Sequence, residues 1–339
     1  MNDILRTDLI ITLLISYFFF LILKKSKVFQ YKFNIETHKN FVSKSEGINF
    51  LLGFILVSSY LIVLKILNVE TISILAIFFI GLASDLKVLD SPKFRLFLQV
   101  VIALTFLTLT NLTISDIRIE WMNKILANNY LAIFFTAFCL AILLNGVNFI
   151  DGLNCNVLFY FLGVIFTLQV ISNDANLDDL SFKYSTLVII LFILIALNFR
   201  GNNYLGDNGS YSLGFIIGIL VIETHINLLE VSPYFFACLL WYPAYENLFS
   251  ILRKLYSKKK PLEPDTQHFH QLLFMFIRNK LKINKYSNTM TSMIINIFNF
   301  LIFFIAYKNN TQTQFLVFLI LASISIKTLL YYLLKKLRT

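Results

Sequence analysis

The chain has 339 residues, of which 58% are hydrophobic and only 14% are charged, and its mean hydropathy is +0.74. A soluble globular domain carries about 25% charged residues, so this composition excludes a water-soluble fold of this size. The formal net charge of +10 raises nucleic acid as a partner, but the placement of the basic residues, given below, explains the charge without it. Cys139, Cys155 and Cys238 form no CxxC pair and predict neither a disulfide framework nor a zinc site.

Apolar segments long enough to cross a bilayer recur along the whole chain. A helix needs about 20 apolar residues to span the hydrocarbon core. We therefore predict spans near residues 8–23, 48–67, 71–83, 93–111, 129–147, 156–172, 182–198, 209–223, 232–251, 289–307 and 314–334. The fold class expected is an all-α integral membrane protein, a bundle of about 10–11 transmembrane helices that forms a single domain over residues 1–339.

The first of these spans resembles a signal peptide in its position, but its charges are arranged differently. Lys24, Lys25 and Lys27 follow the apolar run instead of preceding it, and no small-residue cleavage site is visible. We interpret the segment as an uncleaved anchor with its N-terminus outside.

Basic residues are strongly asymmetric between the two sides of the predicted bundle. The loops after the first, third, fifth, seventh and ninth spans, with the C-terminal tail, hold 22 of the 29 Lys and Arg residues, and the opposite side holds 5. Positive residues mark the cytoplasmic side, so we predict a cytoplasmic C-terminus and a periplasmic N-terminus. The loop 252–288, on the cytoplasmic side, includes an amphipathic helix near 271–282 that we expect on the membrane surface.

Polar residues that could bind a metal or take part in catalysis gather on the same predicted side. Carboxylates at membrane depth are costly and usually face a cavity or a partner, and Mg²⁺ takes oxygen ligands, often one or two carboxylates together with substrate phosphates. For any one Asp, capping of a helix end is the simpler explanation. Three carboxylates in loops that open on one face favour a divalent metal bridged to a diphosphate. These polar residues are Asp85, Asn148, Asp151, Asp207, His268 and His270.

Two local patterns strengthen this interpretation. Asn145, Asn148 and Asp151 are spaced by three, so a helix end would place them on one face. The segment Leu205-Gly-Asp207-Asn-Gly-Ser210 sets an Asp between glycines just before a span, where a glycine backbone and a helix N-terminus both suit a phosphate. Each pattern alone is only moderately specific.

Four sequence blocks together resemble the polyprenyl-phosphate N-acetylhexosamine-1-phosphate transferases, glycosyltransferase family 4, which include the phospho-N-acetylmuramoyl-pentapeptide transferases. They run in family order from about 81 to 273. The blocks are Gly81-Leu-Ala-Ser84-Asp85-Leu with Ser91-Pro-Lys-Phe-Arg95-Leu-Phe-Leu-Gln99, then Asn145 to Gly152, then Asn198-Phe199 with Leu205 to Ser210, and then Gln267-His268-Phe-His270-Gln271-Leu272.

The resemblance implies roles for individual residues of this chain. Asp207 and Asp85 would be Mg²⁺ ligands, and Asp85 would also lie near the lipid phosphate and act as a base. Asp151 would act at the catalytic centre beside Asp85. The substrate-binding residues implied are Asn145, Asn148, Arg95, His268 and His270.

The activity implied is transfer of a sugar-1-phosphate, an N-acetylhexosamine-1-phosphate, from a UDP-sugar to undecaprenyl phosphate, with release of UMP. The partners implied are undecaprenyl phosphate, UDP-N-acetylhexosamine and membrane lipid, with Mg²⁺ as cofactor and no nucleic acid, in the bacterial inner membrane. The lipid-linked product would start a surface polysaccharide, such as O-antigen. The sugar stays open, and so does the oligomeric state, a homodimer included.

Departures from the family pattern leave alternatives. Ser84 stands where the family usually has the first Asp of a pair, and Cys155-Asn156 replaces a glycine-containing continuation. A catalytically weakened relative that scaffolds glycan assembly therefore stays open. So does a multi-pass transporter, which shares the many spans and the buried polar groups, although the polar residues here cluster at one surface and no internal repeat is visible.

Overall fold

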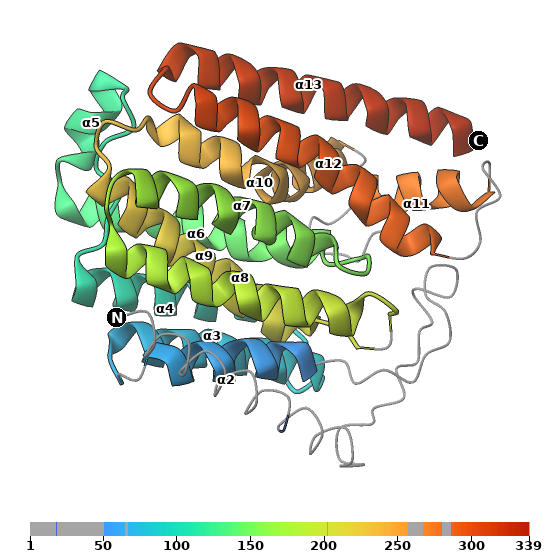
Figure 1. Cartoon of the computed structure of the whole chain (residues 1–339), viewed down its shortest axis with the longest axis horizontal. Coiled ribbons are helices and arrows are strands. Elements are labelled where there is room, and N and C mark those ends of the chain that lie inside the picture. The colour runs from blue at the N-terminus through green and yellow to red at the C-terminus, as the bar shows by residue number, and fades with distance from the viewer. Residues whose placement is uncertain are drawn as a thin grey trace.

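The computed structural model describes residues 18, 51–64, 67–201, 203–256, 267–279 and 286–338, and all regular elements there are helices (Figure 1). The helices are α2 (Leu51–Leu64), α3 (Val69–Asp85), α4 (Pro92–Thr110), α5 (Glu120–Leu126), α6 (Asn129–Ile150), α7 (Asn156–Asp174), α8 (Asp178–Asn198), α9 (Gly206–Asn227), α10 (Pro233–Tyr256), α11 (Phe269–Asn279), α12 (Ser287–Lys308) and α13 (Thr313–Arg338). The predicted all-α membrane bundle is confirmed. Ten of the eleven predicted spans coincide with a helix, and the span 8–23 lies outside the described residues, except for Phe18.

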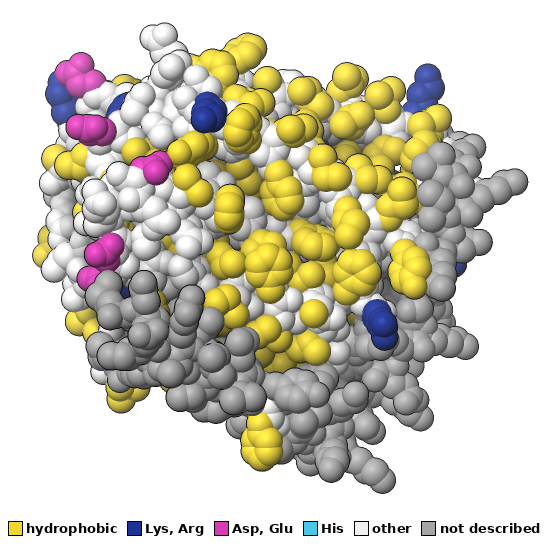
Figure 2. Space-filling model, in the orientation of Figure 1, with side chains coloured by type: hydrophobic (Ala, Val, Ile, Leu, Met, Phe, Trp, Pro, Cys, Tyr) yellow, Lys and Arg dark blue, Asp and Glu magenta, His cyan; other side chains and the backbone are white. Residues whose placement is uncertain are grey.

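Among the described residues, seven helices are long and apolar enough to cross a membrane: α4, α6, α7, α8, α9, α12 and α13. Figure 2 shows hydrophobic side chains spread over the middle of one face of the molecule, while the acidic side chains in view lie toward one end. On α4 and α13 exposed side chains such as Phe97, Leu109, Phe318 and Leu329 point outward. Such an apolar exterior is the expected surface of helices that face lipid.

The centre of the bundle is α9, which contacts α2, α3 and α6 and whose residues are nearly all buried. Two glycines on neighbouring helices permit close helix packing. A Cβ on Gly81 of α3 would lie 2.3 Å from the Asn208 Cα of α9, and one on Gly146 of α6 would lie 2.3 Å from the Pro243 carbonyl oxygen of α10. Any larger residue at these positions would push apart the helices whose ends carry the polar motifs.

Helix starts follow ordinary capping rules where the chain turns. Asn68 and Thr71 form a reciprocal capping box at the start of α3, with both backbone-to-side-chain distances at 2.9 Å. Ser91 caps α4, which has Pro92 in its first turn. The short helix α5 was not predicted from the sequence, because its seven residues are too few to show a periodic pattern.

The predicted amphipathic helix of the 252–288 loop exists but differs in position and surroundings. It begins at Phe269 instead of 271, and its apolar residues pack against α12 and α13. Leu272, Phe274 and Ile277 are each buried. The helix therefore buries its apolar face against the protein.

Candidate functional site

Asp207, the second residue of α9, is the point on which three other helices converge. Its Oδ1 accepts a hydrogen bond of 2.7 Å from the Asn148 side-chain amide of α6. Its Oδ2 accepts one of 2.5 Å from the Ser84 hydroxyl of α3 and lies 3.1 Å from Nη1 of Arg95 on α4. Segments separated by more than a hundred residues are thus joined at a single carboxylate that keeps 28% side-chain exposure.

Ser84 lies between Arg95 and Asp207 and connects them. The Arg95 guanidinium donates to the Ser84 hydroxyl as well as to Asp207. The sequence analysis treated Ser84 only as a departure from the family pattern. In the structure its hydroxyl is an integral hydrogen-bonding member of the cluster, so the departure does not leave a gap beside Asp207.

Asp85 caps the start of α9 from a neighbouring helix. Its Oδ1 accepts the backbone N–H of Asp207 at 2.9 Å, and its Oδ2 accepts that of Asn208 at 3.0 Å. The sequence indicated a phosphate at this helix N-terminus, but Asp85 is the anion bound to these two amides. Helix capping and a place at the site are therefore not exclusive, because the cap fixes Asp85 beside Asp207.

Crowding of the carboxylates raises their affinity for protons. Burial and the negative charge of Asp207 raise the pKa of Asp85, the last residue of α3, to about 8. Burial, with the charges of Asp207 and Asp85, raises the pKa of Asp151 well above its usual range. Asp151 lies just beyond the end of α6. All three predicted carboxylates thus act on one another electrostatically, and a cation among them would be stabilising.

The fold brings only part of the predicted polar helix face to Asp207. That face consists of Asn145, Asn148 and Asp151. Asn148 binds Asp207 and also lies 3.2 Å from the Ser210 hydroxyl. Asn145, one turn earlier, donates instead to the Gln99 side chain at 2.9 Å. Its contact thus joins α6 to α4 and supports the cluster from one turn away.

The two histidines lie at the start of α11, as expected, and both are buried. Their rings stack at 5.6 Å between centroids with an interplanar angle of 12°. A Cβ on Gly152 would lie 2.2 Å from Nε2 of His270, so the imidazole rests directly against the residue after Asp151. This contact places the histidine segment against the loop that carries Asp151.

The loop between Asp151 and α7 is fixed by amide side chains that the sequence analysis did not single out. Asn288 accepts the Asn154 N–H at 2.6 Å, and Asn296 donates to the Asn156 side chain at 3.2 Å. Cys155, whose amide donates to Asn198, has a left-handed φ of 60°. Glycine adopts that conformation without steric cost. Scattered asparagines in apolar helices give no periodic signal, so only the structure identifies them.

A metal ion would find suitable donors here, although not a complete cage. Within the described residues no group of three or more His, Cys, Asp or Glu side chains is arranged to hold a metal. Mg²⁺ in phosphoryl-transfer sites is usually held by one or two carboxylates, and substrate phosphates complete its coordination. The mutually repelling carboxylates around Asp207 fit that second arrangement.

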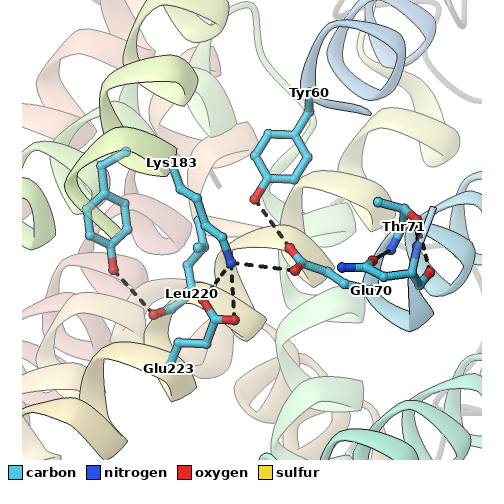
Figure 3. A network of polar contacts seen from close by, with 8 residues as sticks. Tyr60, Glu70, Thr71, Lys183, Leu220 and Glu223 are labelled. Atoms are coloured by element: carbon cyan, nitrogen blue, oxygen red, sulfur yellow. Dashed lines mark hydrogen bonds and ion pairs between the residues drawn. The ribbon is translucent and has the colours of Figure 1, made fainter. Parts of the chain in front are cut away.

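A second polar cluster occupies the other end of the same helices (Figure 3). Lys183 of α8 lies 2.9 Å from Glu223 of α9 and 3.5 Å from Glu70 of α3, and the Tyr60 hydroxyl lies 3.5 Å from Glu70. Lys183 is one of the five Lys and Arg residues on the predicted outer side. In the structure it joins two acidic residues from different helices.

Comparison with known proteins supports one family. The family model described as glycosyl transferase family 4 matches residues 67–225, which cover α3 to nearly all of α9. The match includes Asp85, Arg95, Asn148, Asp151 and Asp207, and it ends before the histidine segment. No curated protein matches the chain. With its helical bundle and the polar cluster at Asp207, this multi-pass membrane chain is similar over residues 67–225 to glycosyl transferase family 4, a match that supports membership of that family and an enzyme of the sugar-phosphate transferase kind.

Proposed function

We propose that the enzyme transfers an N-acetylhexosamine-1-phosphate from a UDP-sugar to undecaprenyl phosphate at the cytoplasmic face of a bacterial inner membrane. A phosphate oxygen of the lipid attacks the β-phosphorus of the UDP-sugar. The bond from that phosphorus to the bridging oxygen breaks, and UMP leaves with the electron pair. The product is a polyprenyl diphosphate sugar, the first lipid-linked unit of a surface polysaccharide.

The observation that carries this proposal is the convergence of Asp85, Arg95 and Asn148 on Asp207. Phosphoryl transfer requires positioning and compensation of negative charge more than covalent help from the protein. Arg95 supplies a guanidinium that is 21% exposed in its side chain and is already at the carboxylate cluster. It can therefore exchange a contact with Asp207 for one with an incoming phosphate oxygen.

Asp207 and Asp151 are the residues we assign to hold Mg²⁺, with Asn148 fixing the orientation of the Asp207 carboxylate. Bound there, the metal would neutralise the diphosphate and the charge that develops on the leaving oxygen. Asp85 is held by two backbone amides, which orients it toward the Asp207 end of the site. We assign it to the attacking lipid phosphate, as a base or as an electrostatic guide.

The orientation of the chain in the membrane follows from charge. The topology predicted from the sequence assigns 22 of the 29 Lys and Arg residues to the side that carries Asp207, and positive residues mark the cytoplasmic side. Nucleotide sugars are charged and water-soluble, so a site on that side receives them directly, while the lipid substrate enters from the bilayer.

The direct test is an assay of UMP release by purified enzyme in lipid nanodiscs with undecaprenyl phosphate and Mg²⁺. UDP-N-acetylglucosamine and a UDP-linked 6-deoxy-N-acetylhexosamine form the first substrate panel. Release that requires both lipid and Mg²⁺ supports the proposal. Uptake of a solute by proteoliposomes without any UMP release would instead favour a transporter.

Ser84 bears on the remaining alternative, a scaffold without activity. Because the Ser84 hydroxyl donates to Asp207 and accepts from Arg95, we expect the natural chain to be active. UMP release that appeared only in Ser84→Asp would establish the scaffold alternative.

A further inference from the structure

A buried ion pair joins α10 to α13 behind the histidine segment. Lys327 Nζ of α13 lies 3.7 Å from Glu246 Oε1 of α10, and their side chains are 4% and 2% exposed. Burying two charges costs several kcal/mol for each ion, and the pair recovers this only with good geometry. Neither residue belongs to the cluster at Asp207, so their placement requires another explanation.

Aromatic rings fix the lysine in place. The Lys327 ammonium lies 3.0 Å from the ring centroid of Tyr242, 4.8 Å from that of Phe269 and 5.2 Å from that of Trp241. Cation–π contacts of this kind stabilise a desolvated ammonium. Phe269 stands between the two histidines in the sequence, so the lysine also contacts the histidine segment itself.

The second oxygen of Glu246 faces the first histidine. His268 Nδ1 lies 3.5 Å from Glu246 Oε2, which is within ion-pair distance. His268 stacks on His270, which rests against Gly152. A continuous series of contacts therefore runs from Lys327 through Glu246 and both histidines to the residue after Asp151.

The backbone before His268 is tied to the same two helices. Arg253 of α10 donates to the Gln267 carbonyl at 2.7 Å and to the Tyr331 hydroxyl of α13 at 3.1 Å. Arg253 thus holds the main chain of the histidine segment, while Glu246 lies beside the imidazole of His268. This separation means that a change at Glu246 need not release the segment.

We infer that Glu246, neutralised by Lys327, is a positioning residue that orients His268 for the substrate diphosphate. This inference rests on the proposed function, together with the substrate-binding role that the family resemblance implies for the two histidines. A carboxylate that accepts from Nδ1–H fixes the tautomer and the ring orientation, and it leaves Nε2 available to a ligand. Lys327 has the separate task of keeping the Glu246 charge stable in an apolar surrounding.

The test removes both charges together, because a single substitution would leave one buried charge unpaired. Glu246→Leu combined with Lys327→Met should preserve expression and thermal stability, since the replacements match the originals in size. We expect kcat/KM for the UDP-sugar to fall roughly 10- to 100-fold, the usual cost of losing such an orienting partner. The fall should be mainly in kcat, because an imidazole is lost from the reacting geometry.

Coupling to His268 separates positioning from simple packing. Adding His268→Ala to the double variant should lower activity no further, because Glu246 acts through that ring. Thr328→Val is the matched control, since it removes the 3.0 Å contact between Tyr245 and Thr328 across the same α10–α13 interface and should leave activity unchanged. Full activity in the double variant, or additive losses with His268→Ala, would overturn the inference.

A second readout does not depend on catalysis. In enzyme labelled with ¹⁵N-histidine, the His268 signal, assigned by its loss in His268→Ala, should report a protonated Nδ1, and the double variant should shift or broaden it. If the natural enzyme releases no UMP from any UDP-sugar, the proposed function fails, but this spectrum still decides the inference. An unchanged His268 spectrum in the folded double variant would defeat it.

Discussion

Helices α3 and α9 carry carboxylates at both ends, and the contacts with neighbouring cations differ between the two ends. The pair runs antiparallel, since Asp85 at the end of α3 meets Asp207 at the start of α9, while Glu70 and Glu223 share Lys183 at the opposite ends. The clusters lie about 22 Å apart, because 15 helical residues rise about 1.5 Å each. One helix pair therefore contains two carboxylate clusters whose negative charge is compensated in different ways.

At the Glu70 end both carboxylates share one cation. Lys183 lies within ion-pair distance of both Glu70 and Glu223, and the side chains of all three are less than a fifth exposed. Charges paired in this manner hold α3, α8 and α9 together. The arrangement is complete within the protein and indicates a structural role.

At the Asp207 end one cation, Arg95, pairs with one of three carboxylates. Arg95 pairs with Asp207, while the pKa values of Asp85 and Asp151 are raised by crowding and burial. The excess negative charge favours a cation that arrives with the substrate. The comparison shows that neutralisation, more than the number of charged residues, separates a structural cluster from a candidate active site.

The largest expected effect is at Asp207. Asp207→Asn should lower Mg²⁺-dependent UMP release by about 10³-fold, in the range of losing one main electrostatic contact in a transition state, while the helix stays folded. Glu223→Gln, on the same helix at the other end, is the matched control and should retain activity within about two-fold of the natural enzyme. Equal activity of the two variants would remove the distinction between the ends.

The next effect is on stability instead of activity. Lys183→Met leaves Glu70 and Glu223 without their cation and should destabilise the fold by about 3 kcal/mol, at the lower end for a broken buried pair because the side chains are partly exposed. The measurement is the Tm in detergent. Molecules that remain folded should keep a normal kcat, and a variant with normal Tm but lost activity would reverse the roles assigned to the two ends.

A smaller effect is expected at Ser84. Ser84→Ala removes the hydroxyl that joins Arg95 to Asp207, and loss of one hydrogen bond to a charged group costs about 1.5 kcal/mol, or roughly ten-fold in kcat/KM. Ser73→Ala on the same helix, which loses only a bond to the Val69 carbonyl, is the control. A loss at Ser84 no larger than at Ser73 would show that the connection to Arg95 is not used.

The last prediction is a pH dependence of stability. The pKa of Asp85 is raised to about 8 in the fold, so the folded state binds more protons than the unfolded chain between about pH 4 and pH 8, and stability falls as pH rises through that window. In EDTA the Tm should therefore decline from pH 5 to pH 8, and Mg²⁺ should flatten the decline. A Tm that is flat in EDTA, or that rises, would contradict the crowding of these carboxylates.

The fold was largely predictable because membrane helices can be recognised in the sequence as long apolar runs. Ten predicted spans coincide with helices, and the third span was extended only slightly, to Val69–Asp85. The helix ends could be anticipated at polar residues such as Asn68 and Ser91. Hydropathy does not predict which helices lie next to each other, so only the structure shows the contact between α3 and α9.

The candidate site was predictable as a set of residues but not as a geometry. The spacing of Asn145 and Asn148 predicts a shared helix face. It does not predict that Asn145 donates to Gln99 while Asn148 donates to Asp207. Similarly, Lys183 and Lys327 are single lysines within apolar helices, and only their partners, Glu223 and Glu246, explain them. Pairs distant in sequence leave no local pattern, so their chemistry appears only in three dimensions.

Electron paramagnetic resonance of Mn²⁺ in place of Mg²⁺, with a non-hydrolysable UDP-sugar analogue, tests the site most directly. We predict a ³¹P hyperfine coupling between the bound metal and the analogue that disappears in Asp207→Asn and persists in Glu223→Gln. Metal bound to the analogue equally well in both variants would contradict the assignment of Asp207 to the diphosphate site.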